Sequence, residues 1–242
     1  MCFLHVYQTT VATDCFQSVG FYAVFSWYLP VNHGVWFTID KSIFYWFNDQ
    51  LVSNRLLSWV IAITNFRDFD GVALLAMGVL YFCLWHKAPT DEKWRIFVTG
   101  VAMVISAIIL NQLGHLIPVS HPSPTKFFSD VHHVTQLTGI ATKDASSDSF
   151  PRDHGMLLMI FASYMLRYFS LRFFSLSVAI VLIFASPRIM IGAHWFTDVA
   201  VGSLSIVLVG MSWWLLTPAC DKMIALLYRY TPAGHRQKKN IA

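Results

Sequence analysis

Charged side chains are scarce in this sequence. Lys, Arg, Asp and Glu make up 12% of the 242 residues, hydrophobic residues make up 56%, and the mean hydropathy is +0.54. A soluble domain carries far more surface charge than this, so that class is excluded. Linkers rich in proline, glycine or serine, low-complexity stretches and internal repeats are also missing. The composition therefore indicates one all-α membrane domain over residues 1–242.

Cysteine is scarce as well, and no disulfide framework is expected. No basic segment followed by a small-residue cleavage site precedes the first apolar stretch, so we expect that stretch to be retained rather than removed as a signal peptide. The net charge of +4 comes mostly from the tail, and nothing links it to nucleic acid. The cysteines are Cys2, Cys15, Cys83 and Cys220.

Long apolar runs are what the sequence has in abundance. A helix needs roughly 20 residues to cross about 30 Å of hydrocarbon, and six runs approach that length. They predict a polytopic bundle of six transmembrane helices. The run Leu56–Phe66 is too short to span and is expected to form an interfacial or partly re-entrant helix. The predicted spans are residues 11–29, 70–86, 96–114, 155–170, 173–187 and 197–216.

Lysine and arginine predict the orientation of the bundle. Ten of them follow the second, fourth and sixth predicted spans, and seven lie on the opposite side. The positive-inside rule makes the richer side cytoplasmic, including the basic tail 221–242. The segments around His154 and His194 then both face the non-cytoplasmic side, which supports one composite site.

Two loops are long. Residues 115–153 form the longest polar segment, and loops of this length are usually functional or disordered. Its mixed charges suit an ordered cap over a polar site on the non-cytoplasmic side. The loop between the first two spans holds Trp36, Tyr45 and Trp46, aromatic residues that are expected at the membrane interface.

A cation, an imidazole and a carboxylate interrupt the apolar sequence at Arg188, His194 and Asp198. Charges in such a setting need a functional reason. If the chain is helical from His194 onward, Asp198 lies one turn below it and can hold one ring nitrogen, which leaves the other free to attack. Arg188 offers a planar fork of donors to phosphate oxygens. A zinc site is the weaker alternative, since Arg188 would repel a metal cation.

A second imidazole, His154, lies just before an apolar helix and is expected to act as general acid and then general base. Its alternative role is to cap that helix. Two histidines, a carboxylate and an arginine suffice for phosphoryl transfer through a covalent phosphohistidine. Neither a metal nor a cofactor is required.

Three further residues are candidates for binding phosphate: Lys143, Arg152 and Ser149. Lys143 adds positive charge for the transferred group. Ser149 can orient the loop together with Asp148, with ordinary turn chemistry as the alternative. Arg152 adds a phosphate contact or extends to the membrane interface.

The motif spacing resembles the type 2 phosphatidic acid phosphatase superfamily. Arg188-x5-His194-x3-Asp198 is similar to its third signature, and Pro151-x-x-His154 occupies the place of the second. The first signature, Lys-x6-Arg-Pro, is not found in the corresponding residues 111–124. His121 in that region can replace the missing cation only when protonated, and its alternative role is that of an ordinary loop histidine.

Longer strings are similar to one member group, the lipid A 1-diphosphate synthases of the Gram-negative inner membrane. The similarity runs from about Gly20 through Asp221. Two departures stand out: Arg152 replaces a small residue of that group, and Ser120-His121 replaces a Lys-Arg pair. The strings that carry the resemblance are residues 26–34, 69–71, 111–114, 142–145, 148–151 and 190–198.

This resemblance implies a phosphotransferase that moves the distal phosphate of undecaprenyl diphosphate to lipid A 1-phosphate, with its site facing the periplasm. Membrane lipids are then its partners, and a small regulatory membrane protein is a further partner to consider. The alternatives are hydrolysis of undecaprenyl diphosphate or another lipid phosphate, and a non-catalytic protein that binds polyprenyl phosphate. The intact third signature argues against the last.

Overall fold

The computed structural model of the chain describes residues 2–66, 69–115, 119, 121–147, 149–150 and 154–239. The side chains of residues 2–9, 113, 115, 154 and 237–239 lie outside this description. The described chain is made of helices and loops, with one isolated antiparallel bridge between Phe66 and Thr142. The expected all-α class is confirmed.

The helices follow one another along the whole described chain. In order they are α1 (Cys2–Tyr28), η1 (Val31–His33), α2 (Val35–Ser53), α3 (Arg55–Thr64), α4 (Phe69–Lys87), α5 (Thr90–His115), α6 (Pro124–Phe127), α7 (Val134–Thr138), α8 (His154–Tyr168), α9 (Leu171–Met190), the π-helical turn η2 (Asp198–Ser203), α10 (Leu204–Leu216), α11 (Pro218–Arg229) and α12 (Pro232–Lys239).

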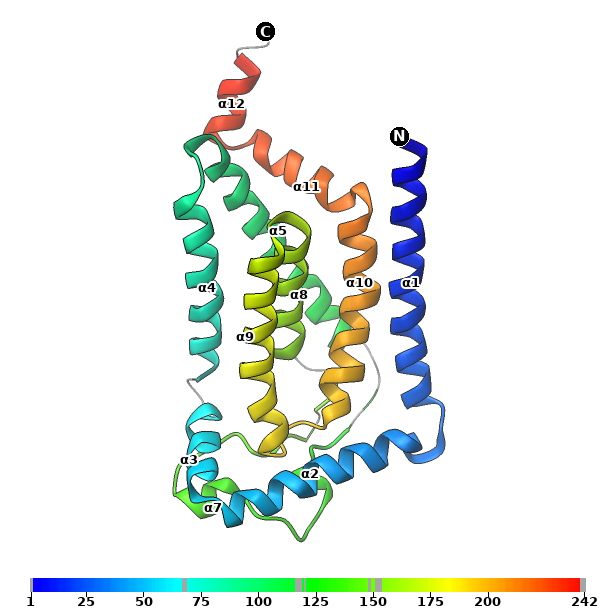
Figure 1. The fold of residues 1–242 in the computed structure, drawn as a ribbon, viewed down its shortest axis with the longest axis vertical. Helices are drawn as coiled ribbons and strands as arrows, with labels where there is room; N and C mark the ends of the chain where they lie inside the picture. Colours follow the sequence, from blue (N-terminus) through cyan, green and yellow to red (C-terminus); the bar gives the residue numbers. More distant parts are fainter. Residues whose placement is uncertain are drawn as a thin grey trace.

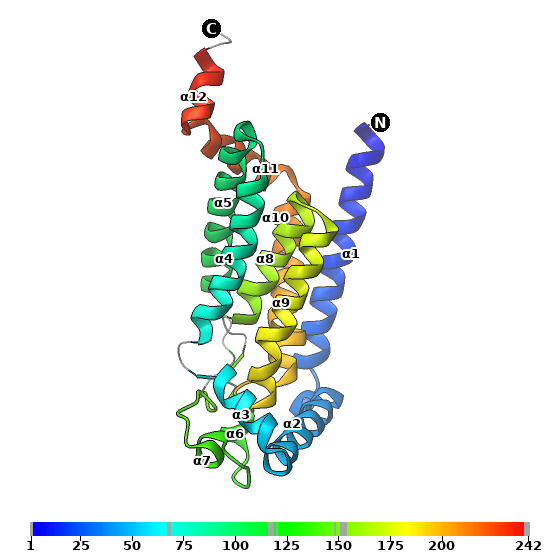
Figure 2. The same cartoon turned by 60° about the vertical axis from the view of Figure 1, so that its left-hand side comes forward.

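The long helices form an upright bundle (Figure 1). Both chain termini lie at one end of it, which α11 crosses, and we call this the terminal end. The helices α2, α3, α6 and α7 gather at the opposite end, the cap end (Figure 2). α1 stands at the side of the bundle and packs against α10.

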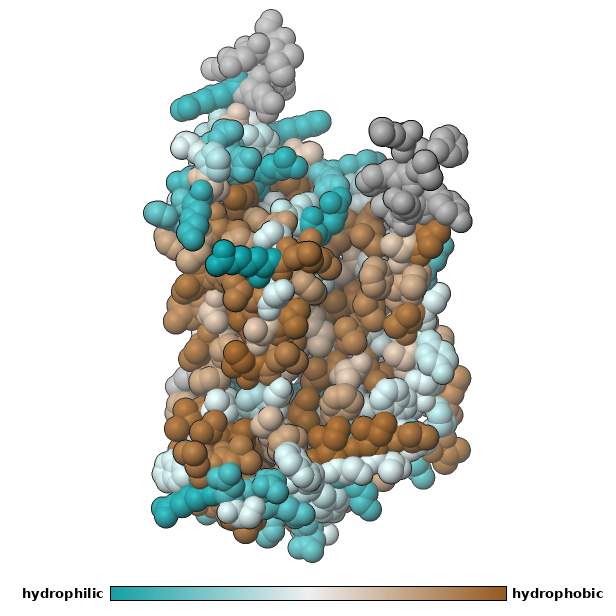
Figure 3. Space-filling view, viewed as in Figure 1, coloured by the Kyte–Doolittle hydropathy of each residue, from teal (hydrophilic) through white to brown (hydrophobic). Residues whose placement is uncertain are grey.

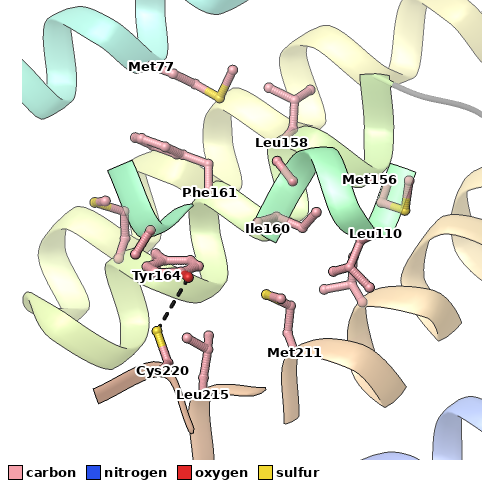
Figure 4. Close-up of a cluster of buried hydrophobic side chains, with 14 of the residues drawn as sticks. Met77, Leu110, Met156, Leu158, Ile160, Phe161, Tyr164, Met211, Leu215 and Cys220 are labelled. Atoms are coloured by element: carbon pink, nitrogen blue, oxygen red, sulfur yellow. Dashed lines mark hydrogen bonds between the residues drawn. The ribbon is translucent and has the colours of Figure 1, made fainter. Parts of the chain in front are cut away.

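The core of the bundle lies around α8, whose Ile160, Tyr164 and Met165 are fully buried. Figure 4 shows side chains of α4, α5, α8, α10 and α11 gathered around Tyr164. The Tyr164 hydroxyl lies 3.4 Å from the sulfur of Cys220. The same hydroxyl accepts a hydrogen bond of 2.9 Å from the indole of Trp214. A polar atom inside an apolar core costs free energy unless it is paired, and these bonds satisfy it.

Four of the six predicted spans are helices long and apolar enough to cross a membrane: Phe69–Lys87, Thr90–Gln112, Leu171–Met190 and Asp198–Leu216. The other two correspond to α1, which is not among these four helices, and to α8, which has 15 residues. On the face that Figure 3 shows, apolar side chains form a broad band across the middle of the bundle, and hydrophilic ones gather toward its two ends. The protein is therefore an all-helical membrane protein, while the count of six spans stays a prediction.

The predicted loop between the first two spans is wrong, because residues 35–53 form α2. One face of α2 is buried and carries Asp40, Phe44, Asn48 and Leu51 at helical spacing. Two of these four residues are polar, so hydrophobic periodicity alone does not reveal the helix. α3 agrees with the expected short helix near Leu56–Phe66, and Asn54 caps it by accepting from the Leu57 amide at 3.1 Å.

Candidate active site

The segment that carries His194 is a turn rather than a helix. α9 ends at Met190, residues 191–195 form what we call the His194 turn, and helical structure resumes at Phe196. The Arg188 carbonyl accepts from the amides of both Ala193 and His194 at 3.1 Å, and Gly192 has a φ of +81°. The expectation of a helix from His194 onward is therefore wrong, since a left-handed residue ends α9 here.

His194 and Asp198 nevertheless lie together. The Nδ1 atom of His194 is 3.5 Å from Oδ2 of Asp198 and 3.1 Å from the carbonyl oxygen of Ser149. A carbonyl can only accept, so this contact requires the proton on Nδ1. The Nε2 atom then keeps its lone pair. The His194 side chain is 19% exposed against 2% for Asp198, so the imidazole is the one that a substrate can reach.

The Asp198 carboxylate serves several partners at once. Its Oδ2 accepts from the Trp195 amide at 2.8 Å, which caps the helix that begins at Phe196. Its Oδ1 lies 3.4 Å from Nδ1 of His121. The His121 ring is buried, lies 5.4 Å from the ring of Trp195 and contacts Trp27 edge-on at 5.5 Å. His121 is thus part of the buried site and is not an exposed loop histidine.

Arg188 and Lys143 meet on one carboxylate. The guanidinium of Arg188 forms an ion pair with Oδ1 of Asp70, and Nζ of Lys143 lies 3.1 Å from Oδ2 of the same residue. Arg188 comes from α9, Asp70 from α4 and Lys143 from the 115–153 loop, whose backbone also bonds to the Asn65 carbonyl at 3.3 Å. Asp70 therefore joins two cations from separate parts of the chain.

Ser149 is buried, and its hydroxyl and amide both donate to the carbonyl of His121, at 2.8 and 2.7 Å. Its own carbonyl accepts from His194. In this geometry Ser149 contacts the site through its backbone and fixes the loop with its hydroxyl.

His154 is the first residue of α8. The next residue, Gly155, lies against η2, and a Cβ placed there would be 3.6 Å from Oγ of Ser203 and from Val199. The start of α8 and the Asp198 segment are thus adjacent. The His154 side chain, Arg152 and Asp148 lie outside the described residues.

Sequence reasoning missed Asp40, a buried carboxylate on α2. It accepts from the Thr197 amide at 3.0 Å and from the Thr197 hydroxyl at 2.5 Å. Burial raises the pKa of Asp40 to about 6, against the opposing effect of these two hydrogen bonds. The one available signal was its spacing of four from Phe44 and of eight from Asn48, which places all three on one helix face.

An apolar groove leads away from the paired charges. It lies between α4, α8 and α9, and Asp70 and Arg188 are the charged residues of its lining. The apolar part of the lining includes Leu74, Met77, Leu157 and Phe184. These apolar side chains lie directly beside Arg188 and Asp70.

The chain is similar to two curated proteins of Escherichia coli (strain K12). It is 47% identical to the lipid A 1-diphosphate synthase over 223 residues, which cover 92% of this chain and 94% of that protein. It is 26% identical to the protein named "Putative undecaprenyl-diphosphatase YbjG" over 148 residues, 61% of this chain and 68% of that protein. No model of a protein family matches the chain, and no solved structure matches it.

Proposed function

The chain belongs to the lipid A 1-diphosphate synthase family, and we propose that it moves the distal phosphate of undecaprenyl diphosphate to the 1-phosphate of lipid A through a phosphohistidine. The identity over nearly the whole chain supports the overall reaction. The observation that supports the covalent route is the contact between Nδ1 of His194 and the Ser149 carbonyl, which leaves Nε2 free to attack.

In the first step, Nε2 of His194 attacks the distal phosphorus of the donor. The new N–P bond forms as the bond from phosphorus to the bridging oxygen breaks, and undecaprenyl phosphate leaves. His154 gives the leaving oxygen its proton in this scheme. Asp198, 3.5 Å from Nδ1, stabilises the positive charge that develops on the His194 ring.

In the second step, an oxygen of lipid A 1-phosphate loses its proton to His154 and attacks the phosphohistidine. The N–P bond breaks, lipid A 1-diphosphate forms, and His194 is regenerated as a neutral imidazole. Both steps use the same residues in reverse order, as a general acid and base must do.

Arg188 and Lys143 are the proposed phosphate clamp, and Arg152 is a further candidate. Positive charge fixed before the reaction stabilises the negative charge of the transferred group. Asp70 holds the first two residues near one another. The polyprenyl chain of the donor then extends into the groove between α4, α8 and α9, where Leu74 and Phe184 would contact it.

The arrangement in the cell is part of the same proposal. Six spans would place the cap end, with His194 and Asp198, at the periplasmic face of the inner membrane, and the basic tail in the cytoplasm. Such a site meets both lipids in the outer leaflet.

The covalent step can be tested by trapping the intermediate. With donor labelled in its distal phosphate and no acceptor, the protein should acquire label that is stable to alkali and lost in acid. His194→Ala should acquire none, while His132→Ala, which changes an exposed histidine of the loop, should label normally. Transfer to lipid A without any labelled protein would refute the phosphohistidine.

The proposed reaction needs no metal, since Arg188 and Lys143 supply the positive charge that a metal would otherwise provide. Among the residues that the structure describes, no three His, Cys, Asp or Glu side chains are grouped as metal ligands. We expect excess EDTA to leave the rate of transfer largely unchanged. A loss of activity that zinc or magnesium then restores would contradict this part of the proposal.

Hydrolysis is the second candidate function, because the chain also shares 26% identity with a protein named as an undecaprenyl-diphosphatase. Water can discharge the same phosphohistidine in place of lipid A. The two reactions differ only in where the phosphate ends, which the label on the distal phosphate reveals.

A further inference from the structure

The buried face of α2 contacts the His194 turn and the cap at three successive helical turns. Asp40 accepts from Thr197, just beyond the His194 turn. Phe44 lies against Gly192 near the start of that turn, where an added Cβ would be 2.5 Å from its ring. Asn48 exchanges two hydrogen bonds with the backbone of His132, at 2.8 and 3.0 Å. One helix face thus contacts both ends of the segment that carries the nucleophile.

The His194 turn needs such support because it lies outside regular helix. The backbone amides at the start of the helix from Phe196 have no partners within that helix. Asp198 satisfies the Trp195 amide and Asp40 satisfies the Thr197 amide, so two carboxylates cap one helix start. Asp198 belongs to the segment itself, whereas Asp40 ties it to a separate helix.

Burying the Asp40 carboxylate costs free energy that a purely structural contact would not require. It is 3% exposed, and the nearby carboxylate of Asp198 adds repulsion that His121 partly offsets. A neutral amide of the same shape would bond the Thr197 amide without burying a charge. An ionised carboxylate gives what the amide does not, strong acceptance from the amide and the hydroxyl of Thr197 together.

We propose that Asp40 is a positioning residue for phosphoryl transfer, which holds Thr197 and thereby fixes the turn that places His194 and Asp198. This inference rests on the proposed function. Asp40 acts through Thr197 and does not touch the donor. Its loss should therefore slow the chemical step while leaving the capture of donor nearly unchanged.

The test is a kinetic comparison of Asp40→Asn with the wild-type protein, with Asp49→Asn as the matched control. Asp49 is an exposed acid on the same helix, so its variant makes the same change of charge away from the turn. We expect kcat to fall about ten-fold or more in Asp40→Asn, as a lost charge-assisted hydrogen bond implies. KM for the donor should stay within about two-fold, and Tm should be equal or higher because a buried charge is removed.

A double-mutant cycle separates positioning from general damage. Thr197→Val removes the hydroxyl that donates to Asp40. The loss of kcat in the double variant, expressed as free energy, should be smaller than the sum of the losses in the two single variants. Additive losses, or a normal kcat in Asp40→Asn, would overturn the proposal. A fall in kcat that is matched by a fall in Tm would also overturn it.

Hydrogen exchange keeps this test independent of the proposed function. The amides of residues 193–198 should exchange faster in Asp40→Asn than in the wild-type protein, with unchanged exchange in α8. If the wild-type protein failed to use undecaprenyl diphosphate, the proposed function would fall, and the exchange measurement would still decide whether Asp40 holds the turn. Equal exchange in the two proteins would refute the holding role.

Discussion

At the scale of single residues, a backbone carbonyl places a proton on Nδ1 of His194. The Ser149 oxygen is nearer to Nδ1 than the Asp198 carboxylate is, at 3.1 against 3.5 Å. The carbonyl accepts a hydrogen bond from Nδ1–H, and in the proposed reaction the carboxylate would stabilise the charge that develops on the ring when Nε2 attacks phosphorus. Orientation and charge stabilisation are thus divided between two residues from different parts of the chain.

Arg188→Lys should weaken transfer strongly, because an ammonium cannot replace a planar fork that faces both phosphate and Asp70. We expect a lower kcat/KM that corresponds to a loss of about 1.5–3 kcal/mol of transition-state stabilisation. This is the range for hydrogen bonds to charged groups. Arg172→Lys, an exposed position on the same helix, is the control and should behave as wild type. Similar kcat/KM values in the two variants would exclude Arg188 from the phosphate clamp.

Part of this site was predictable from sequence and part was not. The spacing of His194 and Asp198 predicted that their side chains lie together, and they do, because the two residues belong to one short segment. The Ser149 carbonyl was not predictable, since a backbone atom leaves no trace in residue identity. Asp40 was missed because 157 positions separate it from its partner Thr197.

At the scale of elements, the His194 turn depends on Gly192. Its φ of +81° favours glycine, and an added Cβ would lie 2.5 Å from Phe44 and 2.8 Å from Thr125. Gly139 is the matched control, since its φ is +75° and a Cβ there would meet nothing within 4 Å.

Gly139→Ala should therefore lose about 1–2 kcal/mol of stability from backbone strain and keep its kcat. Gly192→Ala should lose more stability, and most of its activity, because Phe44 and Thr125 must move with the turn. Thermal unfolding and kcat of the two variants provide the comparison. Equal losses in both would show that strain alone acts at Gly192.

The raised pKa of Asp40 on α2 predicts that activity and stability respond to pH in opposite directions. Burial raises the pKa of Asp40 from 3.8 to about 6, so between those values the folded protein binds a proton that the unfolded chain does not. Stability from this group is therefore present at low pH and is lost as pH rises toward 6, by about 3 kcal/mol. A protonated Asp40 accepts less well from Thr197, so kcat should fall as pH drops below about 6.

The measurement is Tm from about pH 4 to 8 and kcat from about pH 5 to 8, for wild type and Asp40→Asn. Asp198 and His121 are the titratable neighbours of Asp40. Both proteins contain them, so they affect the two profiles alike. The component of the low-pH loss due to Asp40 should vanish in Asp40→Asn. If the two kcat profiles superimpose after scaling, Asp40 does not cause the fall in kcat at low pH.

Elements whose buried face is apolar were predictable, and α2 was not. The long helices α4, α5, α9 and α10 stand out as apolar runs that the membrane requires. α2 buries Asp40 and Asn48 because their partners are polar atoms of Thr197 and of the His132 backbone. Its pattern depends on tertiary contacts, which hydropathy along the chain does not contain.

At the scale of the whole molecule, the bundle brings an apolar groove to a polar site. Arg188 belongs to both, since it lines the groove beside α4 and its carbonyl holds the start of the His194 turn. In the proposed reaction, Arg188 would bind the phosphorylated head of the donor beside the apolar residues that contact its hydrocarbon chain. The gathering of the motifs at one end was expected from the order of the spans, and Gly155 at the start of α8 lies against η2, which begins at Asp198.

The most direct test of the account follows the labelled phosphate itself. The purified protein is placed in liposomes that contain lipid A, with undecaprenyl diphosphate labelled in its distal phosphate. We predict that the label appears in lipid A 1-diphosphate, with equal release of undecaprenyl phosphate and little free phosphate, and that His194→Ala transfers none. Label recovered as free phosphate while lipid A stays unlabelled would contradict the account and show a hydrolase.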